Sequence, residues 1–171
     1  VVQGEGGVLK LDEDFVQGVY GICKEKDILL IVDEVQTGNG RTGELYGYMN
    51  YGITPDIVST AKGLAGGLPM GATLLGEKVK DVLGVSMHGS TFGGNPVSCA
   101  GAVNIISRLT YGFLEDVKRK SKYIIDELKN ADAEAISING QRIVTTSAIE
   151  CDGNVIKVNG QKIGAPFVIK A

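Results

Sequence analysis

The sequence predicts an α/β fold in which a mainly parallel sheet with helices is followed by a short β-rich tail. Short apolar runs rich in β-branched residues alternate with helical patterns up to about residue 129. After that point the pattern changes to alternating strands separated by Asn-Gly pairs, which favour hairpins. Of the 25 glycines among the 171 residues, 15 lie between Gly38 and Gly101. That segment therefore needs unusual backbone shapes.

The first helix is expected directly after Asp12. Apolar residues recur at helical spacing from Phe15 to Cys23, and Asp12 is placed to cap the N-terminus of this helix. The apolar run at residues 28–32 follows at once and is too short to be a separate helix. Because it is rich in β-branched residues, it predicts a buried parallel strand.

Two more short strands are expected at residues 57–60 and 72–75. Asn95 and Pro96 form an N-cap and first-turn pair for a helix that ends near Leu109. A further helix is marked by apolar residues that recur at helical spacing over residues 111–129. Strands that alternate with helices in this way predict a parallel sheet.

The tail has a different pattern. Residues 135–138 and 154–158 alternate between apolar and polar side chains, and each run is followed by Asn-Gly. This predicts a β-meander. We therefore expect three parts: residues 1–110, an α/β unit; residues 111–129, a connecting helix; and residues 130–171, a β-rich tail of different origin.

Composition excludes several classes of protein. With 17 Lys and Arg against 20 Asp and Glu, the net charge is −3, so we expect no nucleic-acid binding driven by positive charge. No apolar stretch reaches the roughly 20 residues of a membrane helix, and no signal peptide is visible. We expect a cytoplasmic protein with no membrane partner and no metal site.

Acidic and basic side chains follow two of the expected strands. Asp33 and Glu34 end the first strand, and ligands of open α/β sheets bind at the carboxyl ends of strands. Lys62 follows the second strand and precedes several glycines, an arrangement suited to Schiff-base chemistry with a ligand held close to the backbone. The alternatives are that Asp33 caps a turn, that Glu34 is solvated, and that Lys62 is a surface lysine.

The segment from His88 to Pro96 leads into a helix N-terminus with hydroxyls and glycines, which indicates an anion site suited to phosphate. A capped turn is the alternative. The Walker spacing is missing, so nucleotide hydrolysis on a P-loop is not supported.

Together these segments resemble, in order and spacing, the class III pyridoxal-phosphate aminotransferases. The matching motifs are QGEGG at 3–7, LIVDEVQTG at 30–38, GRTG at 40–43, PD at 55–56, AKGL at 61–64 and HGSTFGGNP at 88–96. The resemblance implies a fold-type I domain of which residues 1–110 are the second half. It also implies pyridoxal 5′-phosphate as cofactor, joined to Lys62 as a Schiff base.

The resemblance implies the following roles for individual residues. Lys62 would be catalytic and move the proton of the substrate, and Asp33 would pair with the pyridine nitrogen. Val35 would pack on the ring and Gln36 would hydrogen-bond its phenolic oxygen. Ser90 and Thr91 would reach the phosphate of the cofactor in the neighbouring subunit of a homodimer. Glu5 would lie on the substrate side.

Within the family, the motifs are most similar to the branch that transfers an amino group from N-acetylornithine to 2-oxoglutarate in arginine biosynthesis. Branches that act on ornithine and succinylornithine share these motifs. The phosphate loop, the ring-stacking aromatic residue and the carboxylate-binding arginine of the family are not found in the chain. We therefore expect a fragment with little or no turnover by itself.

The tail resembles a different family. Residues 133–144 and 154–160 are similar to an uncharacterised bacterial domain linked to division and sporulation genes. The alternative hypothesis is therefore a non-enzymatic interaction or assembly module defined by the β-rich tail.

Overall fold

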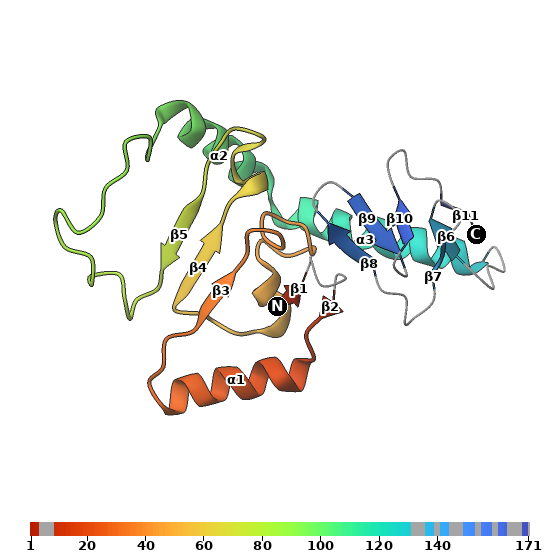
Figure 1. The fold of residues 1–171 in the computed structure, drawn as a ribbon, viewed down its shortest axis with the longest axis horizontal. Coiled ribbons are helices and arrows are strands. Elements are labelled where there is room, and N and C mark those ends of the chain that lie inside the picture. The colour runs from red at the N-terminus through yellow and green to blue at the C-terminus, as the bar shows by residue number, and fades with distance from the viewer. Residues whose placement is uncertain are drawn as a thin grey trace. The chain divides into compact units, whose positions relative to one another are not determined.

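The computed structural model describes residues 1–3 and 9–130, together with the backbone of six strands in the tail. The chain divides into two compact units (Figure 1). One consists of Val1 and Asp12–Val117, and the other of Val2–Leu11 and Lys118–Ala171. The candidate site lies in the first unit.

The first unit is built on a three-stranded sheet of order β3-β4-β5 (Figure 1). The strands are β3 (Ile31–Asp33), β4 (Ile57–Thr60) and β5 (Ala72–Leu75). All three were predicted. β3 and β4 are parallel and β4 and β5 are antiparallel, so the described part of the sheet in the predicted α/β fold is mixed. The connection at residues 61–71 is too short for a parallel return, which needs a dozen or more residues.

Burial of the first strand differs from the prediction. Val32 and its partner Val58 are buried, whereas Ile31 is 62% exposed. Successive side chains of a strand point to opposite faces, so Ile31 and Val32 lie on opposite faces of the sheet. Ile28, Leu29 and Ile31 are all at least 42% exposed, so the apolar run is not buried throughout as predicted.

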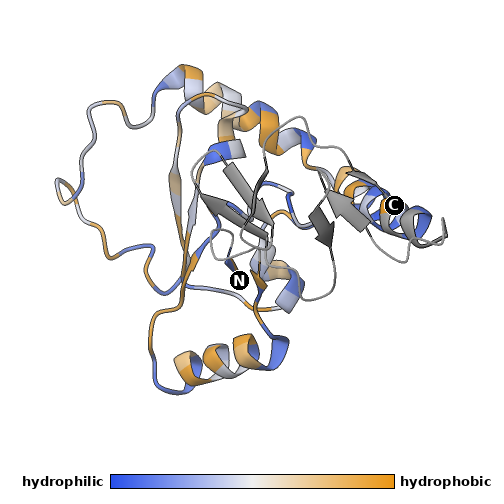
Figure 2. Ribbon diagram, turned by 45° about the vertical axis from the view of Figure 1, so that its right-hand side comes forward, coloured by the Kyte–Doolittle hydropathy of each residue, from blue (hydrophilic) through white to orange (hydrophobic). Residues whose placement is uncertain are grey.

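Helix α1 (Glu13–Glu25) begins where the sequence predicts. The carboxylate of Asp12 accepts hydrogen bonds from the backbone N–H groups of Asp14 and Phe15 at 2.9 and 3.3 Å. Val16 packs with Tyr51 and Ile53 in a buried cluster, and Tyr51 ends the short 3-10 helix η1 (Gly47–Tyr51). Phe15 and Ile22 of α1 are exposed to solvent, and Figure 2 shows orange, apolar segments along the helix.

Helix α2 (Pro96–Arg108) packs against the short 3-10 helix η2 (Lys62–Ala65). Leu64, Ala65 and Ala102 form their shared core. The side chain of Asn95 caps α2 as predicted, with its oxygen 3.0 Å from the N–H of Val97. Helix α3 (Tyr111–Asn130) is also confirmed. Among the described residues, no helix has the length and apolar character that crossing a membrane requires.

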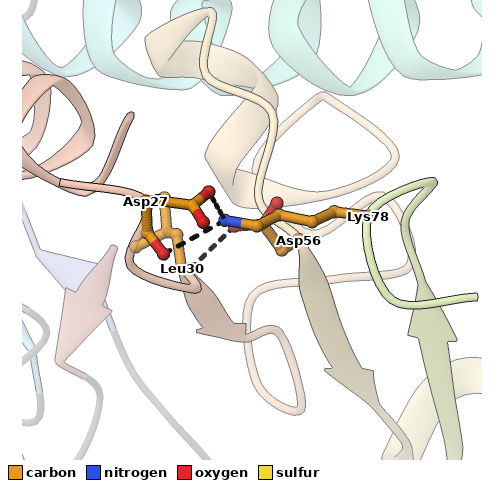
Figure 3. A network of polar contacts seen from close by, with 4 residues as sticks. All are labelled: Asp27, Leu30, Asp56 and Lys78. Carbon is orange, nitrogen blue, oxygen red and sulfur yellow. Dashed lines mark hydrogen bonds and ion pairs between the residues drawn. The ribbon is translucent and has the colours of Figure 1, made fainter. Parts of the chain in front are cut away.

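A polar clamp, formed by Asp27, Leu30, Asp56 and Lys78, joins the amino-terminal side of β3 and β4 to the segment after β5 (Figure 3). The buried carboxylate of Asp56 accepts a hydrogen bond from the N–H of Leu30 at 2.8 Å. The ammonium group of Lys78 lies 2.5 Å from the carboxylate of Asp27. This exposed pair lowers the pKa of Asp27 and raises the pKa of Lys78.

The second unit contains short antiparallel strands. β1 (Val2–Gln3) pairs with β2 (Leu9–Lys10). The tail strands are β6 (Ile136–Ile138), β7 (Gln141–Ile143), β8 (Ile149–Asp152), β9 (Val155–Val158), β10 (Gln161–Ile163) and β11 (Ile169–Lys170). β6 pairs with β7 so that Ile138 lies opposite Gln141, and β9 pairs with β10 so that Val158 lies opposite Gln161. Two residues therefore connect the strands of each pair, as the Asn-Gly pattern predicts.

Candidate functional site

The candidate site lies at the carboxyl ends of β3 and β4. Asp33 is the last residue of β3 and is paired in register with Ser59 of β4. Lys62 comes directly after Ala61, which follows the last residue of β4. Because the two strands are parallel and adjacent, both side chains leave the sheet at the same edge, where ligands of α/β sheets bind. The described residues show no ion pair between Asp33 and Lys62.

Asp33 caps the turn that follows it. Its Oδ1 accepts a hydrogen bond from the backbone N–H of Val35 at 2.8 Å. This is the turn-capping alternative that the sequence left open. This hydrogen bond uses only one of the two carboxylate oxygens. Asp33 is exposed, and none of the described residues hydrogen-bonds to its Oδ2. The cap holds one oxygen and so orients the other.

Glu34 is fully buried, which corrects the hypothesis that it is solvated. Its carboxylate accepts hydrogen bonds from the hydroxyl of Thr37 at 2.5 Å and from the N–H groups of Gly47 and Tyr48, each at 2.8 Å. These donors replace water around the charge. The Thr three residues after Glu34 was a weak local signal, but the two backbone donors come from a loop that sequence reasoning did not place.

Val35 and Gln36 lie in the tight turn between Glu34 and Gly38, directly after Asp33. The N–H of Gly38 donates to the carbonyl oxygen of Glu34 at 2.9 Å. A Cβ atom on Gly38 would stand 2.7 Å from that same oxygen, so the turn needs a glycine here. Val35 is half-buried and Gln36 is exposed. The turn that carries both residues therefore begins at the carboxyl end of β3, directly after Asp33.

Lys62 is exposed and has a left-handed backbone, with φ of 50°. A residue other than glycine rarely adopts this conformation, and such strain is concentrated at functional sites. The side chain of Asn39 contacts Thr60 and Ala61, the two residues before Lys62. The Asn39 side-chain N–H₂ group donates to the hydroxyl of Thr60 at 3.2 Å and to the carbonyl oxygen of Ala61 at 3.1 Å. Sequence reasoning missed Asn39; its place between two glycines signalled only a turn.

An aromatic pair, of which Tyr46 is buried and Tyr48 half-buried, lies beside Glu34. The rings of Tyr46 and Tyr48 stack with centroids 5.8 Å apart. Burial raises the pKa of both phenols, and the carboxylate of Glu34 raises each further. A hydrogen bond with Thr60 partly offsets the rise in the pKa of Tyr46.

A cleft of about 350 Å³ lies at the N-terminus of α2. The hydroxyl oxygen of Ser90 lines it and accepts a hydrogen bond from the N–H of Gly93 at 2.9 Å. Thr91 is exposed and is not among the lining residues. Asp33 and Lys62 are also not among the residues that line the cleft with Ser90. The cleft is lined by Pro69, Met70, Gly71, Ser90, Phe92, Gly93, Gly94, Asn95, Ser98 and Cys99. Glu5 falls outside the described residues.

Comparison of the chain with known proteins shows the family to which it belongs. The family model for class III aminotransferases matches residues 1–158. The chain is 54% identical over 130 residues to an acetylornithine aminotransferase of Haemophilus ducreyi, covering 76% of this chain and 33% of that protein. It is 48% identical over 133 residues to a succinylornithine transaminase of Yersinia pseudotuberculosis, covering 77% of this chain and 32% of the relative.

A solved structure, an ornithine δ-aminotransferase of Plasmodium falciparum, superposes with a TM-score of 0.70 at 32% identity. The superposition covers 92% of this chain and 39% of the Plasmodium chain. The fold is therefore that of part of a pyridoxal-phosphate aminotransferase domain. The chain belongs to the class III aminotransferase family and spans about a third of the length of the curated relatives cited.

The family match extends to residue 158, beyond residue 129, where the α/β pattern of the sequence gives way to the β-rich tail. The separate origin of the tail and its similarity to a division-linked family stay predictions.

Class III aminotransferases depend on pyridoxal phosphate, and the donor set at the sheet edge fits that cofactor. An exposed primary amine on Lys62 and an exposed carboxylate on Asp33 leave neighbouring parallel strands at the same edge. These are the two groups that an aldehyde and a protonated pyridine nitrogen require. The strained backbone of Lys62 is a further observation that is typical of a functional position.

Proposed function

We propose that this chain carries the lysine-bearing part of an aminotransferase site that moves an amino group from N-acetylornithine to 2-oxoglutarate, as in arginine biosynthesis. The observation that carries the proposal is the placement of Lys62, strained and exposed, at the same sheet edge as Asp33. Support for the substrate comes from the 54% identity to an acetylornithine aminotransferase, against 48% to a succinylornithine transaminase.

In this proposal, Lys62 is the catalytic residue. Its amine binds the aldehyde of pyridoxal 5′-phosphate and, once released by the substrate, moves a proton at the substrate α-carbon. The cofactor, when bound, supplies an electron sink. Asp33 keeps the ring nitrogen protonated by pairing with it through Oδ2, the oxygen that does not cap the turn. Val35 covers one face of the ring and Gln36 donates to its oxygen.

Ser90 and Thr91 act in a different site of the same assembly. They lie on the segment before α2, and Ser90 lines a cleft that neither Asp33 nor Lys62 reaches. The cleft and its position at the N-terminus of α2 support the proposal that they contact the cofactor phosphate of a partner subunit in a homodimer. Glu5 contacts the substrate. The described residues beside Lys62 include no phosphate-binding loop, so we expect weak cofactor binding and low turnover by the chain alone.

The test is to trap the cofactor on the chain. Pyridoxal phosphate is added, the mixture is reduced with borohydride, and the labelled peptides are mapped. We expect the label on Lys62 and its loss in Lys62→Arg, because arginine keeps the charge but forms no Schiff base. Lys80→Arg is the control, since Lys80 is an exposed residue that pairs only with nearby Glu77 among the described residues. Label spread over surface lysines but missing from Lys62 would refute the proposal.

Addition of N-acetylornithine, succinylornithine or ornithine to the loaded chain then tests the substrate. We expect N-acetylornithine to convert the bound cofactor fastest, as followed by absorbance. A faster conversion by either of the others would refute the choice of substrate and leave the role of Lys62 intact.

A further inference from the structure

Asn39 connects the two halves of the candidate site. It lies in the loop that follows Asp33 and Gln36, and its side chain reaches the residues that immediately precede Lys62. The segment directly before Asn39 is anchored, because the N–H of Gly38 donates to the carbonyl oxygen of Glu34 and Glu34 is fully buried. Asn39 therefore extends from a rigid support.

The orientation of the Asn39 amide follows from its partners. The carbonyl oxygen of Ala61 can only accept a hydrogen bond, so the N–H₂ group of Asn39 must face it. That leaves the Oδ1 atom of Asn39 buried and without a hydrogen-bond partner among the described residues. An unsatisfied buried oxygen is costly, and the conformation of Asn39 is itself left-handed, with φ of 58°. The contact with Ala61 is kept in spite of both costs.

The contact bears on the backbone of Lys62. The carbonyl oxygen of Ala61 belongs to the peptide group that ends at the nitrogen of Lys62, and it also accepts from the N–H of Leu64 at 3.1 Å. Two donors from different segments thus fix the plane of this peptide. Fixing it restricts the rotation about the Lys62 N–Cα bond, whose φ is 50°.

We propose that Asn39 is a positioning residue for Lys62, which holds the Ala61 carbonyl so that Lys62 keeps its left-handed backbone and presents its amine at the sheet edge. The inference rests on the proposed function for the chemical role of Lys62, but the backbone effect can be measured without cofactor. Asn39 touches neither cofactor nor substrate in this proposal and acts only through Lys62.

The test uses the full chain in three forms. Asn39→Asp keeps the shape of the side chain but replaces the donor with an oxygen that repels the Ala61 carbonyl. Asn39→Gly removes the amide and tolerates a positive φ, so it guards against misfolding. Asn50→Asp is a matched control, because the amide of Asn50 also donates to a threonine hydroxyl and a backbone carbonyl, those of Thr42 and Gly47.

The first measurement is hydrogen exchange of the amides of Leu64 and Gly66 without cofactor. We expect both Asn39 variants to exchange faster by roughly tenfold, the effect of one lost hydrogen bond, while Asn50→Asp matches the original chain. The second measurement is the rate of borohydride-trapped label on Lys62, with label on Lys80 as an internal reference. We expect a drop of roughly tenfold at Lys62 alone.

The outcomes separate the two proposals. If the original chain is not labelled at Lys62, the proposed function fails, and exchange alone decides the role of Asn39. If Lys62 is labelled equally in all variants, or if exchange at Leu64 is unchanged in both Asn39 variants, the positioning role is overturned and the proposed function stands. A uniform loss of label at Lys62 and Lys80 also overturns it, since that reports general unfolding.

Discussion

Glu34 anchors the loop that carries the candidate site. Its carboxylate is fully buried and accepts hydrogen bonds from Thr37, Gly47 and Tyr48. In Glu34→Gln, the amide presents N–H groups to donors, so at least one buried donor loses its partner. We expect the free energy of unfolding to fall by roughly 2 kcal/mol or more, measured by chemical denaturation.

Glu25→Gln is the control for this change. Glu25 is exposed and, among the described residues, forms one ion pair, a 3.8 Å contact with its neighbour Lys26. The free energy of unfolding of Glu25→Gln should therefore stay within about 0.5 kcal/mol of that of the original chain. Equal effects of the two replacements would contradict the anchoring role of Glu34.

Individual site residues were predictable to different degrees. Asp33 and Lys62 could be proposed because charged residues directly after apolar strands are visible in the sequence. Asn39 could not, because its hydrogen bonds to Thr60 and Ala61 span 21 and 22 residues. The burial of Glu34 likewise depends on backbone donors 13 and 14 residues away.

Packing of α2 against η2 depends on one glycine. A Cβ atom on Gly101 would lie 2.9 Å from the carbonyl oxygen of Ala65 and 2.8 Å from the side chain of Leu68. Gly101→Ala should therefore destabilise the chain by about 1–3 kcal/mol, the usual effect of overpacking. It should also loosen η2, which begins at Lys62, so hydrogen exchange at Leu64 is the second measurement.

Gly18→Ala in helix α1 is the matched control, since nothing lies within 4 Å of its added Cβ atom. Replacing this exposed helical glycine should stabilise the chain by about 0.5–1 kcal/mol. Stabilisation in both variants would show that α2 does not approach η2 this closely.

Helices and strands were located well because their signals are local. The caps of α1 and α2, and the strands β4 and β5, agree with the sequence pattern. The burial of each strand was not predictable in the same way. The antiparallel direction of β5 agrees with the short connection at residues 61–71, which the sequence already shows, whereas the exposure of Ile31 depends on which elements pack against the sheet.

The stability of the first unit should fall in alkaline solution. Burial raises the pKa of Tyr46, Tyr48 and Tyr51 above the ordinary value of 10.0. Above that pH the unfolded chain loses these protons before the folded one does, so stability present below pH 10 is lost as pH rises through the folded pKa values. The raised pKa of Lys78 acts in the same direction.

The free energy of unfolding, measured between pH 8 and 12, checks this prediction. Ultraviolet absorbance follows the ionisation of the tyrosines and so separates their contribution from that of Lys78. Tyr46→Phe should reduce the loss above pH 10 and leave the slope below pH 9 unchanged. Tyrosines that all ionise at their ordinary pKa in the folded chain would contradict the prediction.

The sequence alone was sufficient to locate the helices and strands of the first unit, to identify Asp33 and Lys62 as candidates, and to indicate the family. Periodicity, caps and motifs are written within a few neighbouring residues, so they need no knowledge of the fold. The tertiary structure decided which charges are buried, which residues line the cleft with Ser90, and that the side chain of Asn39 hydrogen-bonds to the residue before Lys62. Each of these depends on segments far apart in the chain meeting in space, and no local pattern records which loops meet.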